Sequence, residues 1–206
     1  MKILKSINRP FTDLGKFVLN SVLLLIPIVS FSVLGYILDC AQFASKGDFN
    51  LPPWNNFWRK LWDGILATII LLIYIVVFMI PYTVLFYLDL DISTLGGLIV
   101  IVAILLGIYL LPSAILRFAV ERKFISAFSP KVFQQAFTKA YLIAFLICII
   151  FSIIFNIIII NISSLINLLP IPYEVFTLLS LSLFVVFMYV NQVIVFSVLG
   201  QVYRKL

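Results

Sequence analysis

The sequence predicts an all-α, polytopic integral membrane protein, a helix bundle with four transmembrane spans and a first hydrophobic element that a proline breaks. Hydrophobic residues make up 64% and charged residues only 11% of the 206 residues, whereas charged residues are about 25% of a soluble domain. The mean hydropathy is +1.24. The charges lie outside or at the ends of the apolar runs, as they do around bilayer-crossing helices. We therefore expect one membrane domain, residues 1–206.

Residues 1–16 are predicted to form a lead-in that lies at the membrane interface. Basic and apolar side chains are interspersed there, and Lys and Arg that flank apolar runs are typical of a cytoplasmic membrane face. No small-residue cleavage site follows the first apolar run. We therefore expect this segment to be part of the mature protein and not a signal peptide.

The first hydrophobic element, residues 17–44, has Pro27 near the middle of its apolar run. A proline removes a backbone donor and clashes with the preceding helical turn, so it predicts a helix break. Two arrangements remain open. The element could be a re-entrant hairpin that enters the bilayer and returns, or a kinked fifth span, since the 22 uncharged residues from Phe17 to Leu38 correspond to about 33 Å of helix.

Residues 51–63 form a Trp-rich interfacial entry to the first span. Trp54, Trp58 and Trp62 are four residues apart, so on a helix they would share one face. The ring of Trp is apolar while its N–H requires a partner, which places this side chain at the level of the lipid headgroups. We expect all three residues to be interface anchors.

Long apolar runs predict the four transmembrane spans. Asp63 and Asp89 are separated by 25 uncharged residues, about 37 Å of helix, which suffices to cross a hydrocarbon core of about 30 Å. The predicted spans cover residues 64–88, 94–117, 140–162 and 174–200.

Residues 118–139 are predicted to form a cytoplasmic interfacial segment. We expect the helix of the second span to continue past Arg117 to Phe128, and a new helix to begin at Ser129, because serine caps a helix and the proline after it fits the first turn. In the new helix Phe133 and Phe137 would share an apolar face. The segment would then be an amphipathic interfacial helix.

The distribution of Lys and Arg predicts the orientation in the cell membrane. The connections near Asp89 and Pro170 contain no basic residue, whereas residues 118–139 and the C-terminal tail do. If residues 17–44 form a hairpin, all 14 basic residues face one side, and a fifth span would place four of them on the other. The positive-inside bias favours the hairpin, with both termini in the cytoplasm.

No pattern in the sequence indicates catalysis, a cofactor or a metal site. The chain has no histidine, and its two cysteines lack metal-ligand spacing. The net charge of +6 comes from basic residues at helix ends, so we expect no nucleic-acid partner. Asp39, Asp63 and Arg117 lie closest to the apolar runs, within about two helical turns of an end. We expect them to be paired or solvated at the interface, which argues against proton coupling.

The deepest amides of the predicted spans are Asn156 and Asn191, and Gln192 follows the second of them. A hydrogen bond between helices in a bilayer is worth about 0.6 to 2 kcal/mol. We favour the interpretation that these amides hold helices together. The alternative is that Asn156, Asn191 and Gln192 line a polar path or a ligand cleft.

Several short motifs in the chain can be compared with a known family. They are Pro10-Phe11, Pro27-Ile28-Val29, Gly35-Tyr36, Leu51-Pro52-Pro53-Trp54, Trp62-Asp63-Gly64 and Tyr141-Leu142-Ile143-Ala144. With them the chain resembles, over most of its length, the prokaryotic multi-pass membrane proteins grouped as domain-of-unknown-function family 4013. Members of that family often carry acids around the Trp, where this chain has Pro53, Asn55 and Asn56. The resemblance implies an integral membrane protein of unknown activity and transfers no catalytic residue.

Two functions are compatible with these patterns. The favoured one is a non-enzymatic structural or interaction subunit of the cell envelope. Its expected partners are the lipid bilayer, anionic lipid headgroups at the basic cytoplasmic face, and a second copy or another membrane protein. The alternative is a small permease or channel that is complete only as an oligomer, with the polar path through the three amides.

Overall fold

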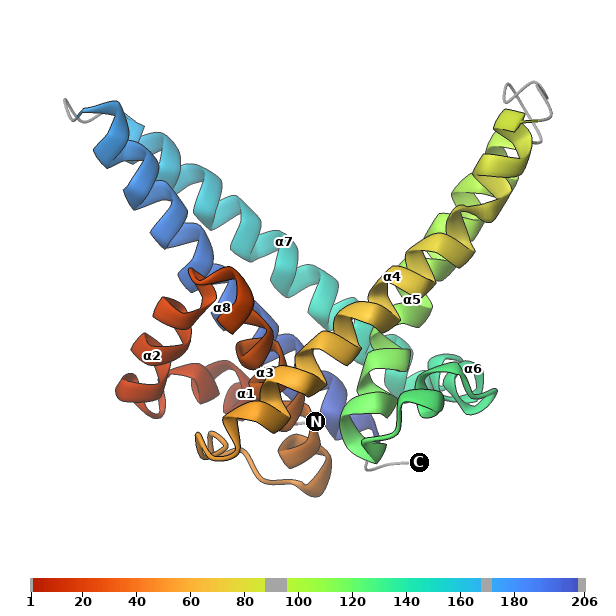
Figure 1. The fold of residues 1–206 in the computed structure, drawn as a ribbon, viewed down its shortest axis with the longest axis horizontal. Coiled ribbons are helices and arrows are strands. Elements are labelled where there is room, and N and C mark those ends of the chain that lie inside the picture. Colours follow the sequence, from red (N-terminus) through yellow and green to blue (C-terminus); the bar gives the residue numbers. More distant parts are fainter. Residues whose placement is uncertain (1, 88–95, 168–171, 204–206) are drawn as a thin grey trace.

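The computed structural model describes residues 2–87, 96–167 and 172–203, and all regular structure in these ranges is helical (Figure 1). In chain order the elements are α1 (Ile3–Asn8), the 3₁₀ turn η1 (Arg9–Phe11), α2 (Leu14–Leu24), α3 (Pro27–Lys46), α4 (Phe57–Tyr87), α5 (Gly97–Glu121), the 3₁₀ helix η3 (Phe124–Phe128), α6 (Lys131–Ala136), α7 (Lys139–Asn167) and α8 (Tyr173–Tyr203). In the described ranges five helices are long and apolar enough to cross a membrane, namely α3, α4, α5, α7 and α8. The predicted all-α membrane fold is confirmed.

Two long helical hairpins diverge from a common base and give the molecule the shape of a V (Figure 1). One arm is α4 with α5 and the other is α7 with α8. The base consists of α1, η1, α2, α3, η3 and α6, together with the ends of the four long helices that pack on them. Large apolar side chains of the arms are exposed, for example Val76 and Ile160, as expected for helices that contact lipid.

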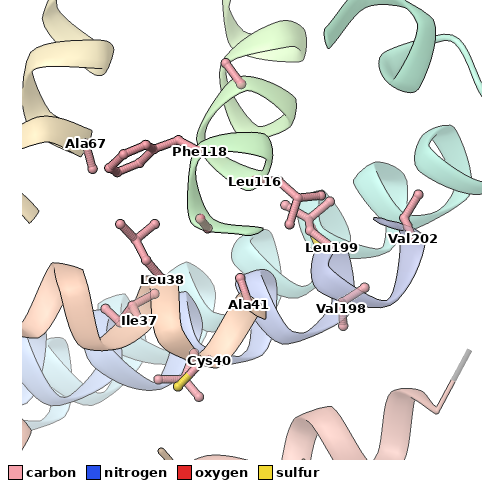
Figure 2. Packing of buried hydrophobic residues seen from close by; sticks show 14 of the residues in the cluster. Ile37, Leu38, Cys40, Ala41, Ala67, Leu116, Phe118, Val198, Leu199 and Val202 are labelled. Atoms are coloured by element: carbon pink, nitrogen blue, oxygen red, sulfur yellow. The ribbon is translucent and has the colours of Figure 1, made fainter. Parts of the chain in front are cut away.

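Helix α3 forms the centre of the base. Of its most apolar window 61% is buried, against 11 to 22% for the other four candidate spans, because α3 packs against α4 on one side and α8 on another. Figure 2 shows Leu38 of α3 pointing toward Phe118 of α5 and Ala67 of α4. On the other side of α3, Gly200 of α8 approaches the backbone of Ala41. The hydrophobic core therefore lies in the base and not between the arms.

Helices α2 and α3 form a short hairpin that begins and ends in the base (Figure 1). The N–H of Lys16 donates to Asp13 at the start of α2 (3.1 Å), and this bond lowers the pKa of the Asp13 carboxyl. Helix α2 ends at Leu24 and α3 begins at Pro27. A proline is accepted at the first position of a helix because its missing N–H would have no partner there.

The two ends of the described chain lie side by side in the base. The backbone N–H of Lys2 donates to the side-chain oxygen of Gln201 (2.6 Å), and the amide of Gln201 donates to Ser6 Oγ (3.0 Å). These contacts join α1 to the last turns of α8. The first and last described helices therefore begin and end on the same side of the molecule.

The helices differ from the predicted segments at several ends. Helix α4 begins at Phe57, so Trp54 precedes it and does not share a helical face with the other two Trp residues. Helix α5 ends at Glu121 and does not continue to Phe128. The connections near Asp89 and Pro170 lie outside the described residues.

The predicted helix after Ser129 is a short one, α6, with six residues. Its buried residues are Val132, Gln135 and Ala136. Phe133, on the opposite face, and Phe137, just beyond the helix, are 51% and 69% exposed. The two Phe side chains therefore point away from the protein core.

Candidate functional site

Two glycines allow α3 and α4 to cross at very short distance. A Cβ atom on Gly35 would overlap the backbone carbonyl of Lys60, and a Cβ on Gly64 would overlap the carbonyl of Phe31. Any larger residue at either position would separate the two helices. The backbone contact at this crossing places charged side chains of both helices next to one another.

We call Asp39, Arg59, Lys60, Asp63 and Arg122 the ion cluster. Asp39 lies one helical turn after the first of the crossing glycines and accepts hydrogen bonds from Arg59 (2.9 Å), Lys60 and Arg122. Asp63 accepts from Arg59 (3.1 Å) and Arg122 (2.6 Å). The cluster therefore joins α3, α4 and the end of α5.

Arg122 reaches the cluster because α5 ends where it does. Arg122 has a left-handed backbone conformation (φ 55°), and its N–H bonds to the carbonyl of Phe118 (2.8 Å). This conformation terminates a helix and turns the chain sharply. This turn is the physical reason that the predicted extension of α5 to Phe128 is wrong. It also directs the guanidinium of Arg122 toward Asp39 and Asp63.

The ion cluster is closed to solvent at its centre. Lys60 is fully buried and Asp39 is 3% exposed. Burying a charge is costly unless it is paired and hydrogen-bonded, and here three cations surround two carboxylates. The Lys60 ammonium also lies 5.7 Å from the centre of the Tyr36 ring. Both carboxylates are therefore occupied by structural contacts.

Arg9 is a second buried cation that sequence reasoning did not single out. It is fully buried, and it donates to the carbonyls of Cys40 (2.7 Å) and Asn50 (2.8 Å) and to Ser197 Oγ (2.9 Å). These acceptors are uncharged and come from α3, the loop after it and α8. Arg9 thus ties η1 into the base. Its burial could not be predicted from the sequence, because Arg9 lies among other basic residues in a segment that was expected at the membrane interface.

Arg117 is paired, as expected for an interfacial charge. Its guanidinium bonds to Glu121 one turn later in α5 and lies 3.5 Å from Gln135 Oε1 of α6. The hydroxyl of Tyr203 donates to the same Glu121 carboxylate (2.9 Å). Arg117 therefore links the ends of α5 and α8 to α6.

The three Trp residues are in two different environments. Trp54 stacks on Tyr36, with the ring centres 5.1 Å apart, and is half-buried in the base. Trp58 and Trp62 lie on the first turns of α4 and are 78% and 61% exposed. Only the last two present their rings at the outer surface, where a lipid headgroup could contact them.

Two of the deep amides make hydrogen bonds, one between helices and one within its own helix. Asn191 of α8 exchanges hydrogen bonds with Ser152 of α7 (3.2 and 3.3 Å). Asn156 is exposed and donates to the carbonyl of Ser152 in its own helix (2.8 Å). Gln192 is half-buried beside Asn191. The contact between Asn191 and Ser152 therefore joins α8 to α7 within one arm.

Among the residues that the structure describes, no group of three or more His, Cys, Asp or Glu side chains is placed to hold a metal ion. Cys40 and Cys148 are free thiols, and both are buried.

The fold, with its apolar arms and its charges gathered in the base, defines a multi-pass helical membrane protein. The profile of the family described as "Protein of unknown function (DUF4013)" matches residues 19–168, and the chain belongs to this family. The match includes α3 to α7 and all of the ion cluster. No curated protein and no solved structure matches the chain.

Proposed function

We propose that this protein is a non-enzymatic structural or interaction subunit of the cell envelope that contacts anionic lipid through its base. One observation carries the proposal. Every Lys and Arg in the described ranges lies in the base, whereas Glu174 is the only charged residue in the described parts of the arms beyond it. Anionic lipid surfaces attract such a basic face.

The orientation follows from the same distribution. The positive-inside bias places the base at the cytoplasmic face of the cell membrane. The arms then cross the bilayer as four spans. The hairpin of α2 and α3 enters from the base and returns to it, so both termini are cytoplasmic. A second copy or another membrane protein is the partner expected for the apolar arms.

The contacts of the polar groups favour a structural role over the permease or channel. The buried carboxylates Asp39 and Asp63 are held by cations, and the amide of Asn191 is satisfied by Ser152. A proton or solute path uses polar groups that can exchange partners along it. Groups that are already paired hold helices in place instead.

Reconstitution into liposomes tests the proposal. We expect the purified protein to bind vesicles that contain anionic phospholipid more tightly than neutral vesicles, with a preference that falls as salt screens the charges. We also expect solute flux no greater than that of protein-free vesicles. Flux that is lost in the Asn191→Leu variant would contradict the proposal and support the permease.

A further inference from the structure

A polar cavity of about 470 Å³ lies in the base. It is formed by the ends of α5 and α8, by α6, and by Thr138 in the connection between α6 and α7. The lining residues are Arg117, Lys131, Gln134, Gln135, Thr138 and Tyr203. The volume is within the range of small-molecule sites in proteins.

The cavity wall contains two buried donors without a partner among the described residues. Gln135 is 1% exposed, and its side-chain nitrogen Nε2 has no hydrogen-bond acceptor. The Nε atom of Arg117 is likewise buried and unpartnered. Buried polar groups are almost always hydrogen-bonded. Because both orphan groups are donors, the ligand that would complete them is an acceptor.

The charges around the cavity favour an anion. Arg117 is paired with Glu121, whose carboxylate also accepts a hydrogen bond from Tyr203, so the net positive charge at the cavity comes from Lys131. Lys131 is exposed at the cavity and adds a positive charge. A guanidinium with an ammonium and an amide donor beside it is a set that binds the oxygens of phosphate well.

We propose that this cavity binds a phosphate group, carried by an anionic phospholipid headgroup or by a free phosphate compound. The exposed rings of Phe133 on α6 and of Phe137 just beyond it favour the lipid, because aromatic rings at the interface bring the headgroup to the level of the cavity. The inference deepens the proposed function, since it names the site at which the base would hold lipid.

The experiment uses the full-length protein in neutral detergent. It is titrated with short-chain phosphatidylglycerol and, separately, with inorganic phosphate, and bound ligand is counted by native mass spectrometry. We expect saturable binding of one molecule. In Lys131→Gln the affinity should fall roughly tenfold, the loss of one charge-assisted hydrogen bond.

Lys139→Gln is the matched control. Lys139 is exposed at the start of α7 and is not part of the cavity wall. The variant removes the same charge as Lys131→Gln but at a position outside the cavity. We expect its affinity to stay within about twofold of the parent protein, since an exposed charge acts weakly at a distance. Arg117→Lys, which keeps the charge but loses the planar fork, should also weaken binding while the melting temperature shows that the protein is folded.

The possible results distinguish the phosphate site in the cavity from the proposed binding of anionic lipid by the whole base. Displacement of the lipid by millimolar inorganic phosphate would identify phosphate itself as the recognised group, and lipid binding without displacement would identify the headgroup as the source. Equal losses in Lys131→Gln and Lys139→Gln would overturn the cavity site while leaving the lipid-binding base intact. Phosphate binding without any lipid binding would support the site and contradict the proposed function. Binding of neither ligand would overturn the site.

Discussion

At the scale of single residues, Asp39 is the acceptor that three cations share. In Asp39→Asn the fully buried ammonium of Lys60 would lose its charged partner. An uncompensated buried charge costs about 3 to 5 kcal/mol, so we expect a loss of stability of that size. Asp63→Asn should cost less, about 1.5 to 3 kcal/mol, because both of its arginine partners retain Asp39. Thermal unfolding of the purified variants in detergent measures the difference.

The double variant Asp39→Asn with Lys60→Met is the control for this prediction. It removes the buried ammonium together with its partner, and replacing both members of a buried pair by apolar or neutral groups is far less costly than removing one. We expect it to be more stable than Asp39→Asn alone. If the single variant unfolds at the same temperature as the parent protein, the cluster does not hold the base together.

Part of this site could be predicted from the sequence. Asp39 and Asp63 lie near the ends of apolar runs, where paired or solvated interfacial charges were expected, and the structure shows the paired case. Their partners could not be predicted, because Arg122 reaches them only through the left-handed conformation that ends α5. The burial of Arg9 depends on acceptors from α3 and α8 that are far away in the chain, and no local pattern reports such contacts.

At the scale of helices, the crossing of α3 and α4 depends on glycine. Gly35→Ala and Gly64→Ala would each push a Cβ into a backbone carbonyl, which cannot move without the helix. Overpacking of this kind costs about 1 to 3 kcal/mol or more. Gly107→Ala is the matched control, since the atoms nearest to its Cβ belong to the side chain of Phe78 (2.9 to 3.1 Å) and not to the backbone of another helix. We expect a clearly lower melting temperature for the first two variants, and equal effects in all three would contradict the role of the crossing.

The contact between α7 and α8 gives a second prediction at this scale. Asn191→Leu removes the bonds to Ser152, and we expect a loss of no more than about 2 kcal/mol with the protein still folded and inserted. In Asn156→Leu the lost bond lies within one exposed helix. That variant should leave the stability unchanged within about 0.5 kcal/mol. A larger loss in Asn156→Leu than in Asn191→Leu would show that the exposed amide has a partner in the membrane.

Hydropathy predicted that the long helices exist, because a bilayer demands an apolar run of fixed length. It predicted their ends less well. Helix α4 begins at Phe57, after Trp54, which was expected on the same helical face as Trp58 and Trp62. Arg59 and Lys60 at the start of α4 are held by Asp39 and not by lipid. The burial of Gln135 in α6 could not be predicted, because polar side chains are mostly exposed.

At the scale of the whole molecule, the V arrangement separates two kinds of contact. The base contains the buried core, the ion cluster and the adjacent chain ends, whereas the arms expose apolar side chains over most of their length. The shape could not be predicted from hydropathy, which reports the length of each helix and not its angle to the next. It depends on the close crossing at Gly35 and Gly64 and on the packing of α3 against α8.

Cysteine labelling can show whether the α2–α3 hairpin returns to its own side of the membrane. In a background with Cys40 and Cys148 replaced by alanine, single cysteines are placed at Lys5 before the hairpin and at Lys46 after it, both exposed in the base. An impermeant thiol reagent on intact cells should label neither, and both should react once the cells are opened, because the positive-inside bias places the base in the cytoplasm.

Tyr87 and Tyr173 are the control positions, since they lie at the far ends of the two arms and are 84% and 77% exposed. Cysteines there should react on intact cells. If α3 instead crossed the bilayer as a fifth span, the cysteines at Lys5 and Lys46 would react on opposite sides. That result would also be incompatible with the bond between Lys2 and Gln201, because these two residues would then be separated by the thickness of the membrane. Labelling of both Lys5 and Lys46 from outside would keep the hairpin but reverse the orientation of the base.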